Sequence, residues 1–287
     1  MLNRAIASAK YALGLQRQGR NLVVFPDDVF IVSYPKSGNT WTRFLVANLA
    51  YPREQVNFAS INRLIPDPEA LSKREMIRLP RPRYIKSHQY FDPRYQKIVY
   101  VVRDPRDVAV SQYHFHRKRR LVEDGTPIEQ FITRFVAGST SPYASWGENV
   151  SGWLATRHGS ARFLLLRYED LMANPTHELA KLALFLGIQA DVPQLEQVVA
   201  CCSADQMRKL ELEQGHLWSS TRNTRQDVPF VREAKAGGWK SNLPESSVAE
   251  IEGAWGHLMR FLRYDLTTGK GRHSGSLSES LLVGPGQ

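Results

Sequence analysis

The sequence predicts an α/β fold, with a single domain built on a parallel β-sheet flanked by helices. Short apolar runs rich in β-branched residues alternate along the chain with longer segments that carry apolar residues at helical spacing. Such alternation is typical of parallel sheets, whose strands are joined by crossover helices. The 287 residues are 42% hydrophobic and 23% charged, which is enough apolar material for a sizeable core.

Four segments are predicted to be strands. The run Ile98–Val102 is continuous and β-branched, as expected of a strand buried on both faces of a sheet. Val29–Val32 is a similar short run that ends at a Ser-Tyr-Pro sequence. The other two predicted strands are Arg83–Lys86 and Phe163–Tyr168.

Helices are predicted after the first and third strands and in the second half of the chain. Asp104 is a suitable N-cap for a helix that runs to about residue 120, because proline follows it at the first helical position. The other predicted helices are Thr40–Ala50, Glu178–Leu186 and Ser246–Leu262. Residues 52–82 contain both prolines and charged residues, and we expect loops and short helices there.

The predicted domain covers residues 27–266. Residues 1–26 are expected to form a basic N-terminal helix, over about 1–20, and a lead-in to the first strand. Residues 267–287 are rich in Gly and Ser and are expected to be disordered. A run of about eighteen apolar residues is needed to span a membrane, and the sequence contains none. With no apolar run typical of a signal peptide and only two adjacent cysteines, we expect a cytoplasmic protein.

The positive charge of the chain is concentrated in one segment. The net charge is +10, and residues 71–120 alone hold 14 basic and 4 acidic residues. One part of the surface should therefore prefer anions. Nucleic acid, an anionic cofactor, an acidic membrane and a merely solvated basic face are all compatible with charge alone.

The segment Ser33–Trp41 has the residues of an anion-binding loop between a strand and a helix. Backbone N–H groups and the positive helix end gather there, Gly38 lets the backbone approach a phosphate closely, and Lys36 adds a charge. The predicted sheet is therefore P-loop-like, although the Walker A pattern G-x-x-x-x-G-K-[ST] is missing. The alternative is a Ser/Gly turn that only caps a helix.

A second candidate anion site follows the third strand. Arg103 stands at the carboxyl end of that strand, where α/β sheets bind ligands, and Ser111 lies two turns into the next helix. An arginine fork and a hydroxyl can clamp a phosphate. An ion pair between Arg103 and Asp107 is the competing interpretation.

Both segments resemble motifs of the cytosolic-type sulfotransferases, which use 3′-phosphoadenosine-5′-phosphosulfate (PAPS) as sulfuryl donor. The resemblance is nearly continuous over Ser33–Trp41 and extends, more weakly, over residues 27–265. It implies that Trp41 stacks on adenine and that Arg103 and Ser111 bind the 3′-phosphate. It also implies that the 5′-phosphosulfate is held by Lys36, Ser37, Gly38, Asn39 and Thr40.

Later segments resemble the same family with more departures. Tyr168, in Arg-Tyr-Glu-Asp-Leu, matches a tyrosine that contacts adenine, although the end of a core strand is the plainer interpretation. Arg232 matches an arginine that binds the 3′-phosphate, but Glu233 and Gly238 replace Lys and Asp of that motif. Cys202 stands where the family has Thr, which leaves its contact with the cofactor in doubt.

Lys86-Ser87-His88 resembles the family segment that carries the general base, which implies that His88 removes the acceptor proton. Histidine suits this task because its ordinary pKa lies near neutrality. We expect Lys36 to stabilise charge on the bridging oxygen and Lys86 to contact the sulfonate oxygens, with no metal. A loop histidine bonded to a backbone carbonyl is the alternative interpretation of His88.

Other functions stay open at this point. They are a P-loop kinase or NTPase, a basic nucleic-acid-binding protein and a PAPS-binding protein without catalysis. The preferred function is transfer to a hydroxyl, or an amine, of a small molecule or glycan, without nucleic-acid partners and with the oligomeric state open. Loops 52–82, 89–95 and 138–148 are expected to form the acceptor pocket, with Pro142, Tyr143 and Trp146 as an aromatic wall.

Overall fold

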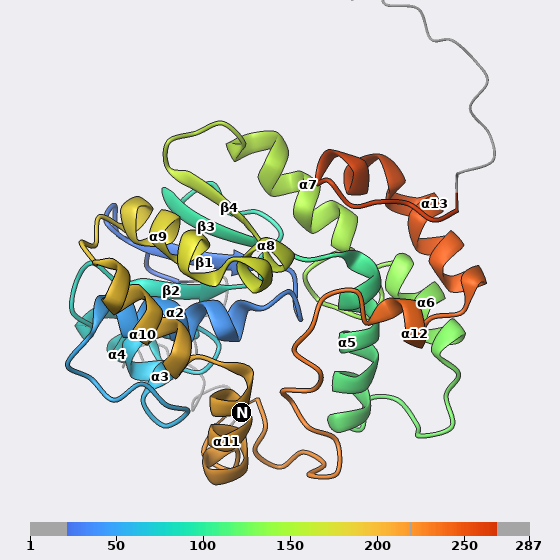
Figure 1. Ribbon diagram of the computed structural model, residues 1–287, viewed down its shortest axis with the longest axis horizontal. Helices are drawn as coiled ribbons and strands as arrows, with labels where there is room; N and C mark the ends of the chain where they lie inside the picture. Colours follow the sequence, from blue (N-terminus) through green and yellow to red (C-terminus); the bar gives the residue numbers. More distant parts are fainter. Residues whose placement is uncertain (1–21, 219, 269–287) are drawn as a thin grey trace, which may run out of the picture.

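The computed structural model describes residues 22–218 and 220–268 of the chain. The helix predicted at residues 1–20 lies outside the described residues, as does most of the predicted disordered tail. The described chain contains a four-stranded parallel sheet with strand order β2-β1-β3-β4 (Figure 1). The predicted α/β fold with a parallel sheet between helices is confirmed.

All four predicted strands form. They are β1 (Val29–Ser33), β2 (Tyr84–Ser87), β3 (Lys97–Val102) and β4 (Phe163–Arg167). Every residue of β1 is buried, and so are the last five of β3, because both strands lie inside the sheet with helices on both faces. The aligned register pairs Ser33 with Val101, so the carboxyl ends of neighbouring strands lie at one edge of the sheet.

Helices follow β1, β3 and β4, whereas residues 88–96 join β2 to β3 without a helix, and loops connect the remaining helices. The first half contains α2 (Asn39–Ala50), α3 (Ile61–Leu64), α4 (Lys73–Arg78), α5 (Pro105–Lys118), α6 (Ile128–Val136) and α7 (Trp146–Arg157). The second half contains α8 (Tyr168–Ala173), α9 (Pro175–Leu186), α10 (Val192–Cys201), α11 (Ala204–Gln214), α12 (Trp239–Asn242) and α13 (Glu245–Phe261).

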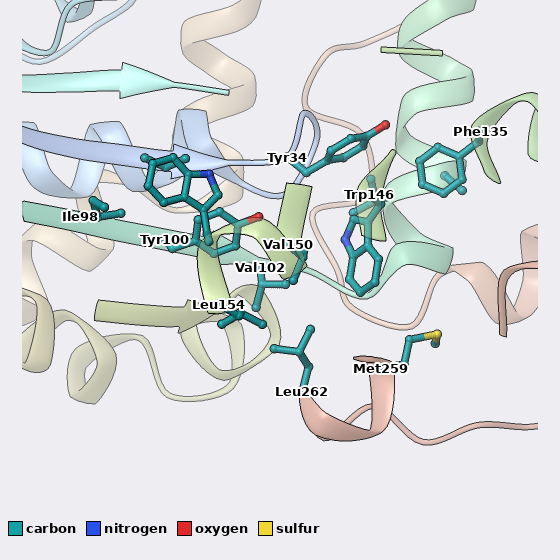
Figure 2. Packing of buried hydrophobic residues seen from close by; sticks show 14 of the residues in the cluster. Tyr34, Ile98, Tyr100, Val102, Phe135, Trp146, Val150, Leu154, Met259 and Leu262 are labelled. Carbon is teal, nitrogen blue, oxygen red and sulfur yellow. The ribbon is translucent and has the colours of Figure 1, made fainter. Parts of the chain in front are cut away.

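The core has two parts, one on each face of the sheet. Phe30 and Tyr100 face the first part, which includes side chains of α5, α6, α7 and α13 (Figure 2). Ile31 and Val99 face the second part, which includes α2, α9 and α10. Alternate residues of one strand therefore serve opposite layers, as the period of a strand requires.

Two local expectations differ from the structure. Tyr168 begins α8 and does not end the fourth strand, because hydrogen-bonded pairing of β4 with β3 stops at Arg167. Trp146 is no part of a loop: it is the first residue of α7, capped by a reciprocal pair of hydrogen bonds between Ser145 and Glu148.

Candidate active site

The carboxyl edge of the sheet opens into a cavity of about 1180 Å³. Lys36 follows β1, His88 follows β2, Arg103 follows β3 and Tyr168 follows β4, so parallel strands carry all four to the same edge. The remaining predicted site residues on the cavity wall are Gly38, Asn39, Thr40, Trp41, Lys86, Ser111 and Arg232. Ser37 is the one predicted site residue that the wall does not include.

The loop between β1 and α2 has a backbone suited to an anion. Lys36 and Gly38 both have positive φ, 69° and 99°. Helix α2 then starts at Asn39 without an acidic residue in its first turn and without a side-chain cap, so its positive end has no negative partner there. The hydroxyl of Ser37 is buried and has no hydrogen-bond partner within the described residues. An oxygen-rich anion would satisfy these groups together.

Gly38 is also required by close packing. An added Cβ at this position would lie 2.6 Å from Cδ2 of Tyr168. The ring of Tyr168 therefore rests directly on the loop, and the guanidinium of Arg103 covers that ring at 4.3 Å from its centroid. Trp41 lies edge-on to the same ring and donates from its indole to the carbonyl of Cys202 at 2.9 Å.

The Lys36 ammonium lies between two aromatic rings. Its Nζ is 4.5 Å from the ring centroid of Phe115 and 4.0 Å from that of Phe230. Burial, and next the nearby charge of Arg103, lower the pKa of Lys36 to about 7. The sequence analysis identifies neither aromatic residue. Phe230 in particular is distant along the chain and belongs to a loop.

The side-chain amide of Asn39 is bonded within the fold. Its amide donates to the carbonyl of Ile31 at 3.0 Å and to the hydroxyl of Ser33 at 3.2 Å. The side chain thus ties the start of α2 to the end of β1. A contact of Asn39 with a phosphate would have to come from its backbone N–H.

Arg103 is held by carbonyl groups on both sides of the cavity. Its guanidinium donates to Lys36 O at 3.4 Å and to Lys235 O at 3.0 Å. The alternative pairing with Asp107 is present only as a long contact of 3.9 Å. The Asp107 carboxylate instead accepts the backbone N–H groups of Gly237 and Trp239, at 2.7 and 2.9 Å.

These bonds from α5 fix the loop that carries Arg232. The Arg232 guanidinium contacts Glu233 at 3.2 Å, and burial lowers the pKa of Arg232. Glu233, which replaces the basic residue expected there, is also paired with Lys235 at 2.8 Å. Arg232 and Ser111 both face the cavity that contains Arg103, so the three predicted 3′-phosphate residues are brought together.

His88 has a defined tautomer. Its Nδ1 lies 2.7 Å from the carbonyl oxygen of Ser33, which can only accept, so Nδ1 carries the proton and Nε2 keeps its lone pair. Burial, and next the charge of Lys86, lower the pKa of His88 to about 3. The imidazole is therefore neutral near pH 7. The amide of Asn149 donates at 3.1 Å to both His88 O and Tyr143 O, which ties the base to the 138–145 loop.

Lys86 already has a partner in the described structure. Its Nζ contacts the Asp67 carboxylate at 2.5 Å, and this charge, with that of Arg43, outweighs burial and lowers the pKa of Asp67 to about 2. No pattern in the sequence indicates Asp67 as a site residue, because the pair joins β2 to a loop without regular structure.

The predicted acceptor wall is partly wrong. Pro142 and Tyr143 line the cavity, together with Asp67 and residues 69–71 of the first predicted loop. Trp146, by contrast, is fully buried against Trp255. None of residues 89–95 lines the cavity. They lie against α7 instead, where the indole of Trp153 donates to Gln89 O and packs on the ring of Phe91.

The basic run at residues 117–120 does not form one continuous charged surface. Lys118 is buried and donates to the carbonyls of Arg225 and Val228 at 2.9 and 2.7 Å. In the part of the chain that the structure describes, no helix is long and apolar enough to cross a membrane. No group of three or more His, Cys, Asp or Glu side chains within the same residues is arranged to hold a metal ion.

Comparison with known proteins connects this site to one family. The model for the sulfotransferase domain matches residues 26–261. Sulfotransferase 1A1 of dog is 30% identical over 234 residues, covering 76% of this chain and 78% of the relative. Human sulfotransferase 1C2 is 28% identical over 240 residues with the same coverage.

Solved structures share the fold. Retinol dehydratase in complex with androsterone and the inactive cofactor PAP has a TM-score of 0.68 and 22% identity, over 91% of this chain and 88% of that one. Mouse sulfotransferase SULT7A1 complexed with PAP has a TM-score of 0.69 and 22% identity, over 87% and 89%.

Proposed function

The chain belongs to the sulfotransferase domain family and is a sulfotransferase, and we propose that it moves the sulfuryl group of PAPS to a hydroxyl or amine by in-line displacement. One observation carries the proposal. The anion loop at Lys36, with the uncapped start of α2, lines the same cavity as a neutral histidine whose Nε2 can accept a proton.

The donor nucleotide is proposed to lie along this edge. Backbone N–H groups of residues 37–40 and the hydroxyl of Ser37 would hold its 5′ end. Arg103, Ser111 and Arg232 would hold the 3′-phosphate, and Trp41 and Tyr168 would contact adenine. That two solved relatives contain PAP, the product of this donor, supports the assignment.

In the reaction, the acceptor oxygen forms a bond to sulfur while the bond from sulfur to the bridging phosphate oxygen breaks. His88 receives the acceptor proton at Nε2, and its Nδ1–H stays bonded to Ser33 O. Lys36 would stabilise the negative charge that develops on the leaving oxygen. Lys86 keeps further N–H donors for the sulfonate oxygens besides the one that contacts Asp67.

The proposal is tested with the full chain, PAP and labelled PAPS. At a hundredfold excess over Kd, PAP should stabilise the protein by about 2.7 kcal/mol. His88→Gln should keep this stabilisation and lose about 10²–10⁴-fold in turnover, since general-base catalysis contributes that much. His177→Gln, on the exposed side of α9, is the matched control and should keep full activity.

Normal turnover by His88→Gln would refute the assigned base. PAP binding without sulfation of any acceptor would instead favour a PAPS-binding protein that lacks catalysis. The acceptor is proposed to be a small molecule or glycan; the cytoplasmic location and the lack of nucleic-acid partners stay predictions.

A further inference from the structure

Two arginines on the wall of the active-site cavity have no role in the proposed reaction. Arg119 directly follows α5, and Arg222 belongs to the loop between α11 and α12. Both residues line the cavity and both are exposed, so they lie at its mouth, where a ligand can reach their guanidinium groups. Neither side chain forms an ion pair within residues 22–218 and 220–268.

The other charged groups of the wall are already paired or assigned. Each carboxylate of the described wall accepts hydrogen bonds from a cation, from a tyrosine hydroxyl or from backbone N–H groups. These carboxylates are Asp67, Glu69, Asp107 and Glu233. The proposed function assigns Lys36, Arg103 and Arg232 to the donor. Arg119 and Arg222 are therefore positive charges that neither the protein nor the donor uses.

Arg119 is close to the lysine that is expected at the reacting bond. The ring centroid of Phe115 lies 5.7 Å from Cζ of Arg119 and 4.5 Å from Nζ of Lys36. Because both distances end at the same point, the guanidinium and the ammonium are at most about 10 Å apart. A small acceptor whose hydroxyl lies beside Lys36 can therefore place its other end at Arg119.

The loop that carries Arg222 is fastened to the same end of α5. The ammonium of Lys118 donates to Arg225 O and Val228 O at 2.9 and 2.7 Å, and the backbone N–H of Arg225 donates to Lys118 O at 3.0 Å. Figure 1 shows this loop, in orange, alongside the C-terminal end of α5. The two arginines thus belong to segments that are hydrogen-bonded to each other within three residues of both side chains.

The mouth of the cavity also has apolar side chains. Leu121 and Leu217 line it, with 59% and 53% of their surface exposed. A guanidinium presents its N–H groups as a fork that matches the two oxygens of a carboxylate. The wall therefore fits a molecule with a hydroxyl at one end, an apolar body, and a carboxylate at the other end.

We propose that Arg119 and Arg222 bind a carboxylate of the acceptor, so that the enzyme prefers hydroxy acids over neutral alcohols and phenols. This inference rests on the proposed function, because it places the acceptor hydroxyl beside Lys36 and His88. The donor is itself an anion and would repel a negatively charged acceptor. A preference for the acid therefore requires positive charge besides that of the donor-binding residues.

The test compares hydroxy acids with their uncharged amides, with labelled PAPS as donor. The acids are 4-hydroxyphenylacetate, 3-(4-hydroxyphenyl)propionate and 6-hydroxyhexanoate, each paired with its primary amide. In at least one pair the acid should have about tenfold higher kcat/KM, the effect of charge-assisted contacts with two partly solvated guanidinium groups. This acid-to-amide ratio should fall toward one in about 1 M salt, where the screening length is about 3 Å.

Substitution of the arginines tests the same ratio. Arg119→Gln and Arg222→Gln should each lower it about threefold, and the double variant should bring it to one or below. Arg120→Gln is the matched control and should keep the ratio, because Arg120 is also exposed and adjacent in the chain but does not line the cavity. Titration of each variant with PAP shows that it folds and retains the donor site.

The possible outcomes separate the inference from the proposed function. A ratio of one or below for every pair in the unchanged protein would overturn the inference, as would sulfation of other acceptors but of none of these acids. An equal loss in Arg120→Gln would attribute the preference to net charge and reject the site. Lower PAP affinity with an unchanged ratio would assign the arginines to the donor instead. A protein that binds PAP and sulfates nothing would refute the proposed function.

Discussion

Gly38→Ala should destabilise the protein by about 2–5 kcal/mol. The backbone at Gly38 has a φ of 99°, and a left-handed conformation costs an L-residue roughly 1–2 kcal/mol. The added Cβ would also lie 2.6 Å from Cδ2 of Tyr168, and overpacking of this kind costs about 1–3 kcal/mol. The free energy of unfolding, measured by urea titration, gives the sum.

Two further variants separate these costs. Gly159 has a φ of 82° but no atom within 4 Å of an added Cβ, so Gly159→Ala should cost only the backbone part, about 1–2 kcal/mol. Tyr168→Val removes the two nearest ring atoms, and in that background Gly38→Ala should also cost about 1–2 kcal/mol. The reasoning is refuted if Gly38→Ala costs no more than Gly159→Ala, or if Tyr168→Val leaves its cost unchanged.

Three other predictions concern charge. Asp28→Asn should cost about 3–5 kcal/mol in urea unfolding, because it leaves Arg83 buried without its ion pair, whereas Asp27→Asn on the exposed neighbouring pair should change little. PAP affinity, measured by calorimetry, should fall as pH rises above about 7, because the protonated form of Lys36 binds the anion; a flat profile would contradict this. The fall of kcat/KM on acidification that is due to protonation of His88 should lie near pH 3, because its imidazole has a pKa of about 3. If this fall instead lies near pH 6.5 and His88→Gln removes it, the prediction is wrong.

The parts of the fold that local sequence determines were predictable. Buried strands such as β3 are continuous β-branched runs, and Asp104-Pro105 marks the start of α5. Helix α7 was missed although Ser145 and Glu148 form a capping box that the sequence displays. That signal would have removed Trp146 from the acceptor wall.

The site was predictable only where it follows strand ends. The positions of Lys36, His88 and Arg103 follow from strand order, because parallel strands end at one edge. The groups that tune them could not be found, since Phe230 and Asp67 reach the site through tertiary contacts between distant loops. Such contacts leave no periodic pattern in the sequence.

The most direct test of the account is the crystal structure of the full chain with PAP. The account predicts the 5′-phosphate against the backbone N–H groups after Lys36, and the 3′-phosphate between Arg103, Ser111 and Arg232. A nucleotide bound elsewhere, or with its 3′-phosphate in solvent, would contradict the claim that this edge of the sheet holds both ends of one donor.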